Sequence, residues 1–363
     1  MRMETFRLNR MKAVIGAGLP FAISLALCFL SVGIIASWVE SYESEIDPIF
    51  GYVFKAGRVG HWRTEGNGNG YWTSHGVRRA RLPGKSEGPP ILLVGNSFTE
   101  ATQVNDAEHY AHILEKELAI NGKSIPVLSF GKSGCTVADY IAEADKLKMV
   151  FQPRWVIVQV AERDFGGKSW DRTAPGFARF VRAAYHGGIS VVSTPLRDRG
   201  QKSFLMRTFE EFPNLIPYCL IYDRLNEFEQ WVQNEKPWFH ATVPESGSAG
   251  PRSMISDYPV GEEMKLLADS FDHRMTLLYL PPFDPRKPLC EGETEALFRM
   301  VAETNGIRFV SLRGKFGELA SEGKSPYGFS NTRFNYGHWN AYGHEAAAQL
   351  LLLDLLKMKH GIY

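Results

Sequence analysis

The sequence predicts a three-layer α/β/α domain around a central, mostly parallel sheet of five strands, preceded by an N-terminal transmembrane helix. Five short apolar runs between residues 91 and 312 predict strands that are buried on both faces. Segments with helical periodicity separate several of these runs, and such alternation implies right-handed crossovers with helices on both sides of a parallel sheet. An uncharged stretch at residues 13–39 predicts the transmembrane helix.

The transmembrane helix is predicted from its length and from the charges around it. Residues 13–39 carry no formal charge over 27 positions, which at about 1.5 Å per residue exceeds the roughly 30 Å hydrocarbon core of a bilayer. Basic residues precede this stretch and acidic residues follow it, so the positive-inside rule places a tail of residues 1–12 in the cytoplasm and the body outside. A cleaved signal peptide is the alternative, but its apolar region is shorter, about 7–15 residues. We therefore expect an uncleaved single-pass anchor.

Behind the anchor, residues 40–90 predict an irregular lead-in, because they are rich in glycine and polar residues and keep no sustained period. Residues 91–363 are expected to form the α/β domain. Its strands are predicted at residues 91–94, 125–130, 155–160, 275–280 and 307–312, and its helices at 107–120, 137–149, 261–270, 293–304 and 345–358. Residues 166–274 are too many for a simple crossover and predict an insertion with a helical segment at 209–234. Its Trp170, Trp231 and Trp238 either form a platform over the strand ends or pack a small core of the insertion.

Composition excludes several classes of protein. The 44% hydrophobic and 12% aromatic content of the 363 residues excludes a disordered chain. With 41 Lys+Arg against 40 Asp+Glu, the chain has no large positive field, which argues against a nucleic-acid-binding protein. The four cysteines are scattered and show no CxxC spacing, so neither a disulfide scaffold nor a zinc site is predicted. We expect no metal and no cofactor.

Candidate catalytic groups follow the first predicted strand. The chain there reads Gly95-Asn96-Ser97-Phe98-Thr99. A serine on a tight turn after a buried strand can expose its hydroxyl at the sheet edge, with backbone N–H groups nearby to stabilise an oxyanion. The alternative is that Ser97 or Thr99 only caps a helix.

The second and third strands also end in polar or glycine-containing segments. Gly131 and Gly134 allow the loop after the second strand to approach a ligand closely. Cys135 in this loop is a rival nucleophile, although no visible feature would lower the pKa of its thiol. After the third strand, Arg163 and Asp164 indicate either a polar pocket or a local ion pair.

A histidine-rich segment precedes the last helix and reads Gly-His-Trp-Asn-x-x-Gly-His from Gly337 to His344. His338 lies in a loop that can reach the strand ends, where a neutral imidazole would accept a serine proton and return it to a leaving group. His344 begins the helix and is expected to be a surface or capping residue.

Taken in order, these blocks resemble the SGNH (GDSL-type) hydrolase superfamily of serine esterases and acyltransferases, over most of residues 45–360. The resemblance implies a flavodoxin-like fold, with Ser97 as nucleophile and His338 as catalytic base. It also implies an oxyanion hole made by the backbone N–H groups of Ser97 and Gly134, with Arg163 at the position of a third donor.

Three positions depart from the family pattern. Asn96 replaces the usual aspartate before the nucleophile, and Arg163 stands where the family has an asparagine of the oxyanion hole. Arg163 either donates hydrogen bonds to an oxyanion or an anionic sugar, or turns into an ion pair with Asp164. The acid expected two or three residues before the histidine is missing. Asn335 or a backbone carbonyl would then orient His338, and Asp284, after the fourth strand, is a substitute by topology.

The resemblance and the anchor together predict a function and a location. Similar membrane-anchored bacterial proteins modify acyl groups in exopolysaccharide and alginate systems. We therefore expect a single-pass protein of the bacterial inner membrane whose periplasmic domain adds or removes acyl groups, in the first place acetyl, on a cell-surface polysaccharide. Its partners would be the acylated glycan or another ester substrate, the membrane and polysaccharide-export proteins, but no nucleic acid. The alternatives are an inactive glycan-binding or scaffold protein of a polysaccharide export system and a lipid esterase.

Overall fold

The computed structural model of the chain describes residues 18, 20–31, 34, 42, 44–79, 88–165, 178–182, 189–193, 259–282, 292–332 and 335–358. Residues 20–31 are helical and fall in the segment predicted to anchor the chain. Among the described residues, no helix is long and apolar enough to cross a bilayer. Much of the 13–39 segment lies outside the described residues, so the anchor remains a prediction.

The five predicted strands form one sheet. They are β5 (Ile91–Gly95), β6 (Val127–Gly131), β7 (Trp155–Ala161), β10 (Met275–Leu280) and β11 (Arg308–Ser311), arranged in the order β11-β10-β7-β5-β6. Every pairing in this sheet is parallel. Numbered along the chain, the order is 2-1-3-4-5, which is the flavodoxin-like order. The prediction of a five-stranded, parallel central sheet is confirmed.

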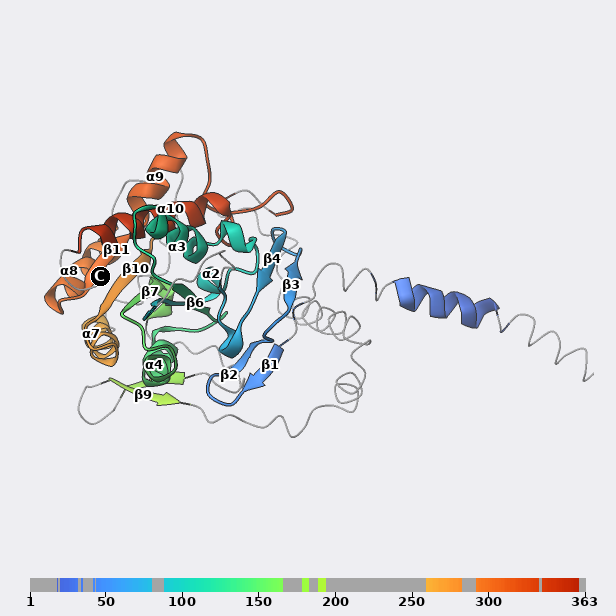
Figure 1. Ribbon diagram of the computed structural model, residues 1–363, viewed down its shortest axis with the longest axis horizontal. Helices are drawn as coiled ribbons and strands as arrows, with labels where there is room; N and C mark the ends of the chain where they lie inside the picture. The colour runs from blue at the N-terminus through green and yellow to red at the C-terminus, as the bar shows by residue number, and fades with distance from the viewer. Residues whose placement is uncertain are drawn as a thin grey trace, which may run out of the picture. The chain divides into compact units, whose positions relative to one another are not determined.

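Helices cover both faces of this sheet, as the three-layer prediction requires (Figure 1). One face packs against α4 (Val137–Phe151), α7 (Val260–Ser270) and α8 (Glu293–Thr304), and the other against α3 (Tyr110–Ile120), α9 (Arg313–Ser321) and α10 (Ala341–Leu356). The sequence did not predict α9. This helix is short and contains Gly314 and Gly317, which lower its intrinsic helix propensity.

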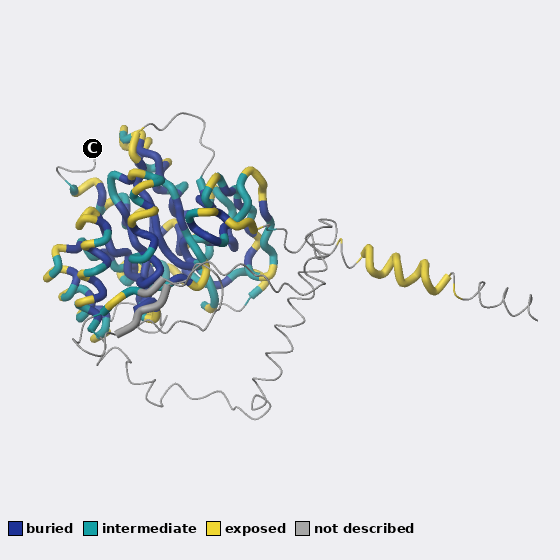
Figure 2. Tube along the Cα trace, turned by 90° about the horizontal axis from the view of Figure 1, so that it is seen from below, coloured by how far each residue is buried: buried dark blue, intermediate teal, exposed yellow. Residues whose placement is uncertain are grey.

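Alternate residues of β5 pack into the hydrophobic cores on the two faces of the sheet. Leu92 and Val94 of β5 belong to the cluster on the α4 face, whereas Ile91 and Leu93 belong to the cluster on the α3 face. Figure 2 shows the strands as buried segments and the exposed residues mainly on helices and connecting loops. Because both faces are covered, the strands read as continuous apolar runs, which is the signal that identified them.

The lead-in contains more regular structure than the sequence predicts. Strands β1 (Ser44–Asp47) and β2 (Gly51–Phe54) form one antiparallel hairpin, and β3 (Val59–Trp62) and β4 (Gly68–Tyr71) form another. This segment packs on the domain: the ring of Phe50 lies 4.9 Å from that of Phe130, and Arg78 bridges to Ser129 of β6. By their internal contacts, residues 42–198 and 245–363 form one compact unit, so the lead-in belongs with the sheet.

The predicted insertion is described only in part. Strands β8 (Ala178–Arg182) and β9 (Ile189–Ser193) pair antiparallel, and α7 leads into β10. The helical segment expected at 209–234 and the three tryptophans of the insertion lie outside the described residues.

The sheet topology fixes where a site can form. From β5 the chain passes to β6 on one side of β5 and then to β7 on the other side. The switch point of the sheet therefore lies between β5 and β7, and ligands of such sheets bind outside the carboxyl ends of the strands there. Ser97 follows β5, and Arg163 follows β7.

Candidate active site

The nucleophile candidate stands on the first turn after β5. Asn96 is the N-cap of the one-turn helix α2 (Ser97–Glu100), because its side chain accepts a hydrogen bond of 3.1 Å from the backbone N–H of Phe98. Thr99 is buried and its hydroxyl shares a 2.8 Å hydrogen bond with Tyr110. Neither Ser97 nor Thr99 therefore caps the helix, and the Ser97 hydroxyl is available for another contact.

That contact is made by His338. Its Nε2 lies 2.9 Å from the Oγ of Ser97, which is the separation expected of a nucleophile and its general base. The loop around His338 is held on its C-terminal side, since Asn340 caps α10 and also donates to the carbonyls of Ser325 and Gly328 at 2.8 and 3.0 Å. The structure thus brings together the serine and the histidine that the sequence singled out.

Glu65, a residue of the lead-in, is the third member of this hydrogen-bonded group. Oε2 of the Glu65 carboxylate lies 2.6 Å from Nδ1 of His338. Oε1 of the same carboxylate accepts a hydrogen bond of 2.6 Å from the backbone N–H of His338. Burial opposes ionisation of this carboxyl, but the hydrogen bonds and the charge of His338 outweigh it, and the pKa of Glu65 is lowered. A carboxylate on Nδ1 leaves Nε2 free to accept the proton of Ser97, as in a Ser-His-acid triad.

The expectations for the orienting group need correction. The partner of His338 Nδ1 is Glu65 and not Asn335, which occupies the preceding turn with a φ of 60°. Asp284 lies outside the described residues. The sequence does not predict Glu65, because this residue lies in the turn between β3 and β4, next to neither the histidine nor a strand of the central sheet.

A long-range contact holds the Glu65 turn in place. The side chain of Asn331 accepts a hydrogen bond from the N–H of Gly66 at 2.9 Å and donates to the carbonyls of Gly66 and Arg63 at 2.9 and 3.0 Å. The glycine-rich turn is therefore fixed by the C-terminal segment that also carries His338. Apolar runs do not reveal this turn, because its two strands, VGHW and GNGY, are only partly buried.

The loop after β6 lies beside the nucleophile turn. Gly131 pairs with Gly95 of β5, and a Cβ at Gly131 would collide with the backbone of Thr99 and Glu100. Gly134 has a φ of 80°, a conformation that glycine adopts without strain. This is the loop expected to supply the second N–H of the oxyanion hole.

Cys135 in the same loop is not a nucleophile. It is buried, and desolvation raises the pKa of its thiol well above the ordinary value, so the thiol stays protonated. The uncharged thiol is both inaccessible and unreactive in this environment.

Arg163 and Asp164 do not form an ion pair. Asp164 is buried and accepts hydrogen bonds from the Nδ2 of Asn96 at 2.9 Å and from the N–H of Ala161 at 2.7 Å. Burial raises the pKa of Asp164 to about 6. Arg163 is exposed, and its guanidinium carbon lies 5.8 Å from the centre of the Phe98 ring. The amide of Asn96 therefore donates a hydrogen bond to Asp164. An aspartate at position 96 would instead place two carboxylates in contact.

His344 is not at the surface, contrary to the prediction. It is buried in α10, and its ring stacks on that of His109 with centroids 5.3 Å apart. Burial lowers the pKa of His344 to about 3, so its ring is neutral. It packs beneath the candidate site without contacting Ser97 in the described part of the chain.

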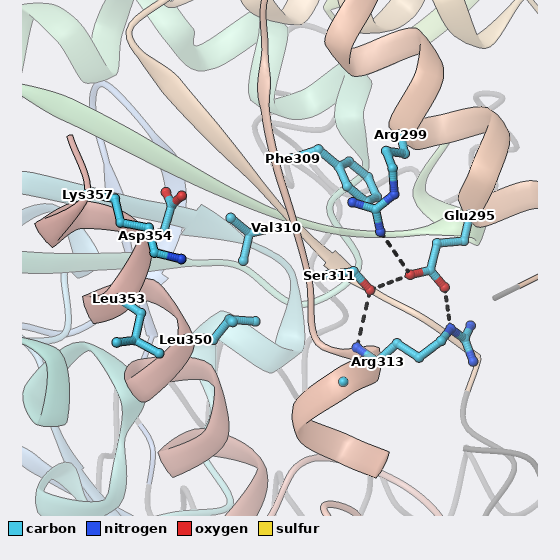
Figure 3. Close-up of a pocket in the computed structure, with 11 residues that line it drawn as sticks. Glu295, Arg299, Phe309, Val310, Ser311, Arg313, Leu350, Leu353, Asp354 and Lys357 are labelled. Atoms are coloured by element: carbon cyan, nitrogen blue, oxygen red, sulfur yellow. Dashed lines mark hydrogen bonds and ion pairs between the residues drawn. The ribbon is translucent and has the colours of Figure 1, made fainter. Parts of the chain in front are cut away.

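A separate pocket of about 430 Å³ lies at the edge strand β11 (Figure 3). Its carboxylates are already engaged, Glu295 by Ser311 and Arg313, and Asp354 by Arg308. Neither Ser97 nor His338 lines it. Among the described residues, no cluster of His, Cys, Asp or Glu has the composition of a metal site.

Comparison with known proteins gives only distant structural similarities. No protein-family model and no curated protein sequence matches the chain. The acetylxylan esterase Axe2 from Geobacillus stearothermophilus matches with 14% identity over 74% of this chain and 94% of that chain, at a TM-score of 0.38. LAE5, an α/β hydrolase from the metagenome of Lake Arreo, matches with 14% identity over 76% and 100%, also at 0.38. TesA matches with 12% identity over 74% and 98%, at 0.37. At these TM-scores the similarity says nothing about activity, which must be argued from the site.

Proposed function

We propose that this chain is a serine esterase or O-acyltransferase of the SGNH type, with Ser97, His338 and Glu65 as its catalytic triad. The observation that carries the proposal is the continuous hydrogen-bonded chain from the Ser97 hydroxyl through the His338 ring to the Glu65 carboxylate, with distances of 2.9 and 2.6 Å. A serine and a base that is itself held by an acid form the arrangement required for nucleophilic acyl transfer.

The first half of the reaction acylates the enzyme. Ser97 Oγ attacks the acyl carbon of an ester, and its proton passes to Nε2 of His338, whose positive charge Glu65 stabilises. The backbone N–H groups of Ser97 and Gly134, with the guanidinium of Arg163, would stabilise the oxyanion. His338 then returns the proton to the leaving alcohol, and the acyl group remains on Ser97.

The second half removes the acyl group. His338 accepts a proton from water or from a sugar hydroxyl, and the resulting nucleophile attacks the acyl carbon. Water gives a hydrolase and a sugar hydroxyl gives a transferase. The third member of the triad favours an enzyme over an inactive binding protein, because Glu65 supplies the acid whose absence, together with the Arg163 replacement, indicated that alternative.

The substrate and location follow from the N-terminal segment. We propose that residues 13–39 anchor the protein in the bacterial inner membrane and that the domain faces the periplasm. Basic residues before the segment and acidic residues after it support this orientation. The substrate would then be an acyl ester, in the first place an acetyl ester, of a cell-surface polysaccharide, and polysaccharide-export proteins would be partners.

Labelling with a fluorophosphonate tests the chemistry. The full chain in detergent should be labelled and should hydrolyse p-nitrophenyl acetate, and Ser97→Ala should lose both properties. Equal labelling of wild type and Ser97→Ala would reject the mechanism. Release of acetate from an acetylated oligosaccharide, compared with its transfer to an added sugar acceptor, then separates hydrolase from transferase, and a panel of lipid esters tests the remaining alternative.

The location needs its own test. Resistance of the full chain to extraction from membranes by alkaline carbonate, and activity of alkaline phosphatase fused after residue 45, are the results expected of a periplasm-facing anchor. Extraction into the soluble fraction, or an inactive fusion, would contradict it.

A further inference from the structure

The one-turn helix α2 carries an acidic side chain as well as the nucleophile. Ser97 is its first residue, and Glu100 is its last. The Glu100 carboxylate accepts a hydrogen bond from the hydroxyl of Ser133, in the loop after β6. Ser133 immediately precedes Gly134, so α2 holds the nucleophile at one end and contacts the oxyanion loop at the other.

The backbone of α2 is fixed from the sheet side. The buried guanidinium of Arg78 donates to the carbonyl of Glu100 at 3.2 Å and also to that of Ala101. The carbonyl of Thr99 accepts hydrogen bonds of 2.9 Å from His109 and from Ser129. The end of the helix is therefore a rigid platform, from which the Glu100 side chain extends to the loop.

The loop itself is held at its base but exposed at its tip. At the base, Lys132 donates from its backbone N–H to the carbonyl of Gly95 at 3.0 Å and from Nζ to that of Phe50 at 2.8 Å. Ser133 and Gly134 form the exposed tip, and Cys135 beyond them is buried. Among the described residues, the side-chain contact made by the tip is the one from Ser133 to Glu100.

The surroundings of Glu100 are consistent with this contact. Burial raises the pKa of its carboxyl, while hydrogen bonds from Ser133 and the charges of His338 and Lys132 act in the opposite direction. A carboxylate can only accept hydrogen bonds, so it orients a hydroxyl donor in a defined direction.

We propose that Glu100 is a positioning residue that holds the Ser133–Gly134 tip, so that the N–H of Gly134 faces the acyl group on Ser97. This inference rests on the proposed function and deepens it. An oxyanion donor acts only from a preorganised position, and a misplacement of about 1 Å can cost up to about 10²-fold in rate. Glu100 acts through the loop and does not itself touch the substrate.

Three variants of the full chain test this role. Glu100→Ala and Ser133→Ala should each lower kcat on p-nitrophenyl acetate about tenfold with KM changed less than twofold, and should weaken binding of an alkyl boronic acid, which forms a tetrahedral adduct on the serine, by the same factor. Glu100→Gln, which keeps an acceptor oxygen, should recover most of the activity. The double variant should be no worse than Glu100→Ala alone, because Ser133→Ala removes only the hydroxyl that contacts that carboxylate. Glu318→Ala, at an exposed position of α9, is the matched control.

The outcomes separate the two proposals. Wild-type-like kcat and boronate binding in both alanine variants would overturn the positioning role while leaving Ser97-dependent turnover intact. A rise in KM alone would overturn it too. If the wild type itself showed no Ser97-dependent turnover, the proposed function would fail and the inference with it. Ser133→Ala keeps the test valid if Glu100→Ala does not fold, because Ser133 is an exposed loop residue.

Discussion

Glu65 and His338 are 273 positions apart in the chain, and two hydrogen bonds of 2.6 Å join the carboxylate of one to the ring and the backbone of the other. The ring contact sets the tautomer, with the proton on Nδ1 and the lone pair on Nε2 toward Ser97. The backbone contact fixes the loop that carries the ring. The lead-in therefore belongs to the proposed catalytic unit, because the hydrogen-bonded chain of Ser97, His338 and Glu65 is incomplete without it.

Replacing the acid by its amide tests this relationship. We expect Glu65→Gln to lower kcat by about 10³- to 10⁴-fold, since the amide no longer stabilises the imidazolium and can favour the wrong tautomer. KM should change little, because Glu65 is held by His338 and not by substrate. Steady-state kinetics on p-nitrophenyl acetate measure the effect, with Glu322→Gln at an exposed site as control. A loss smaller than tenfold would exclude Glu65 from the triad.

Gly337 provides a second test from the histidine side. Its φ is 93°, and a Cβ there would collide with Oε1 of Glu65. Gly337→Ala should cost about 1–2 kcal/mol of stability through the backbone conformation. It should also lower kcat at least tenfold by separating Glu65 from His338.

The matched control for this variant is Gly261→Ala in α7, where the nearest atom to a Cβ would be Val301 Cγ1 at 3.7 Å. This change should leave kcat unaltered and slightly raise the thermal midpoint, because alanine is the better helix former. Unchanged kcat in Gly337→Ala would show that the close approach of Glu65 is not needed.

The sheet and two of the three residues of the proposed triad could be predicted, because short stretches of sequence indicate them. Strands covered on both faces need unbroken apolar runs, and Ser97 directly follows one of them. Glu65 could not be found this way, because its hairpin is fixed by distant groups: a Cβ at Gly68 would collide with the carbonyl of Thr102, and Asn331 holds the turn. The prediction for His344 was wrong for a related reason, since its ring stacks against that of His109, the N-cap of α3, which is far away in the sequence.

Arg163 is expected to act on the transition state. Its exposed guanidinium is not engaged by Asp164, and it lies over Phe98, the residue after the nucleophile. Arg163→Ala should therefore lower kcat by about 10²-fold, the loss typical of one oxyanion-hole donor. Arg163→Lys keeps the positive charge but lacks the planar set of N–H donors of a guanidinium, so it should retain only part of the wild-type kcat. A variant that raised KM and left kcat unchanged would assign Arg163 to substrate binding instead.

Asp164 should make stability depend on pH in a direction opposite to that of most carboxylates. Burial raises its pKa from 3.8 to about 6 in the folded protein, so the folded state binds the proton more tightly than the unfolded chain. Its contribution to stability is complete below pH 3.8 and is lost as the pH rises through about 6. The shift corresponds to a free energy on the order of 3 kcal/mol.

Asp164→Asn isolates this contribution. The amide oxygen can accept the hydrogen bonds that Oδ2 now accepts from Asn96 and Ala161, and the amide stays neutral at every pH. The free energy of unfolding in urea should therefore rise for Asp164→Asn relative to wild type between pH 4 and pH 6.5 and level off above. Asp269→Asn is the control of opposite sign, because a hydrogen bond from Lys265 lowers the pKa of that exposed carboxyl below 3.8. The stability of this variant relative to wild type should fall only as the pH rises toward 3.8 and should stay level between pH 4 and pH 6.5. A difference between Asp164→Asn and wild type that stayed constant over this range would show that Asp164 is ionised in the folded protein throughout.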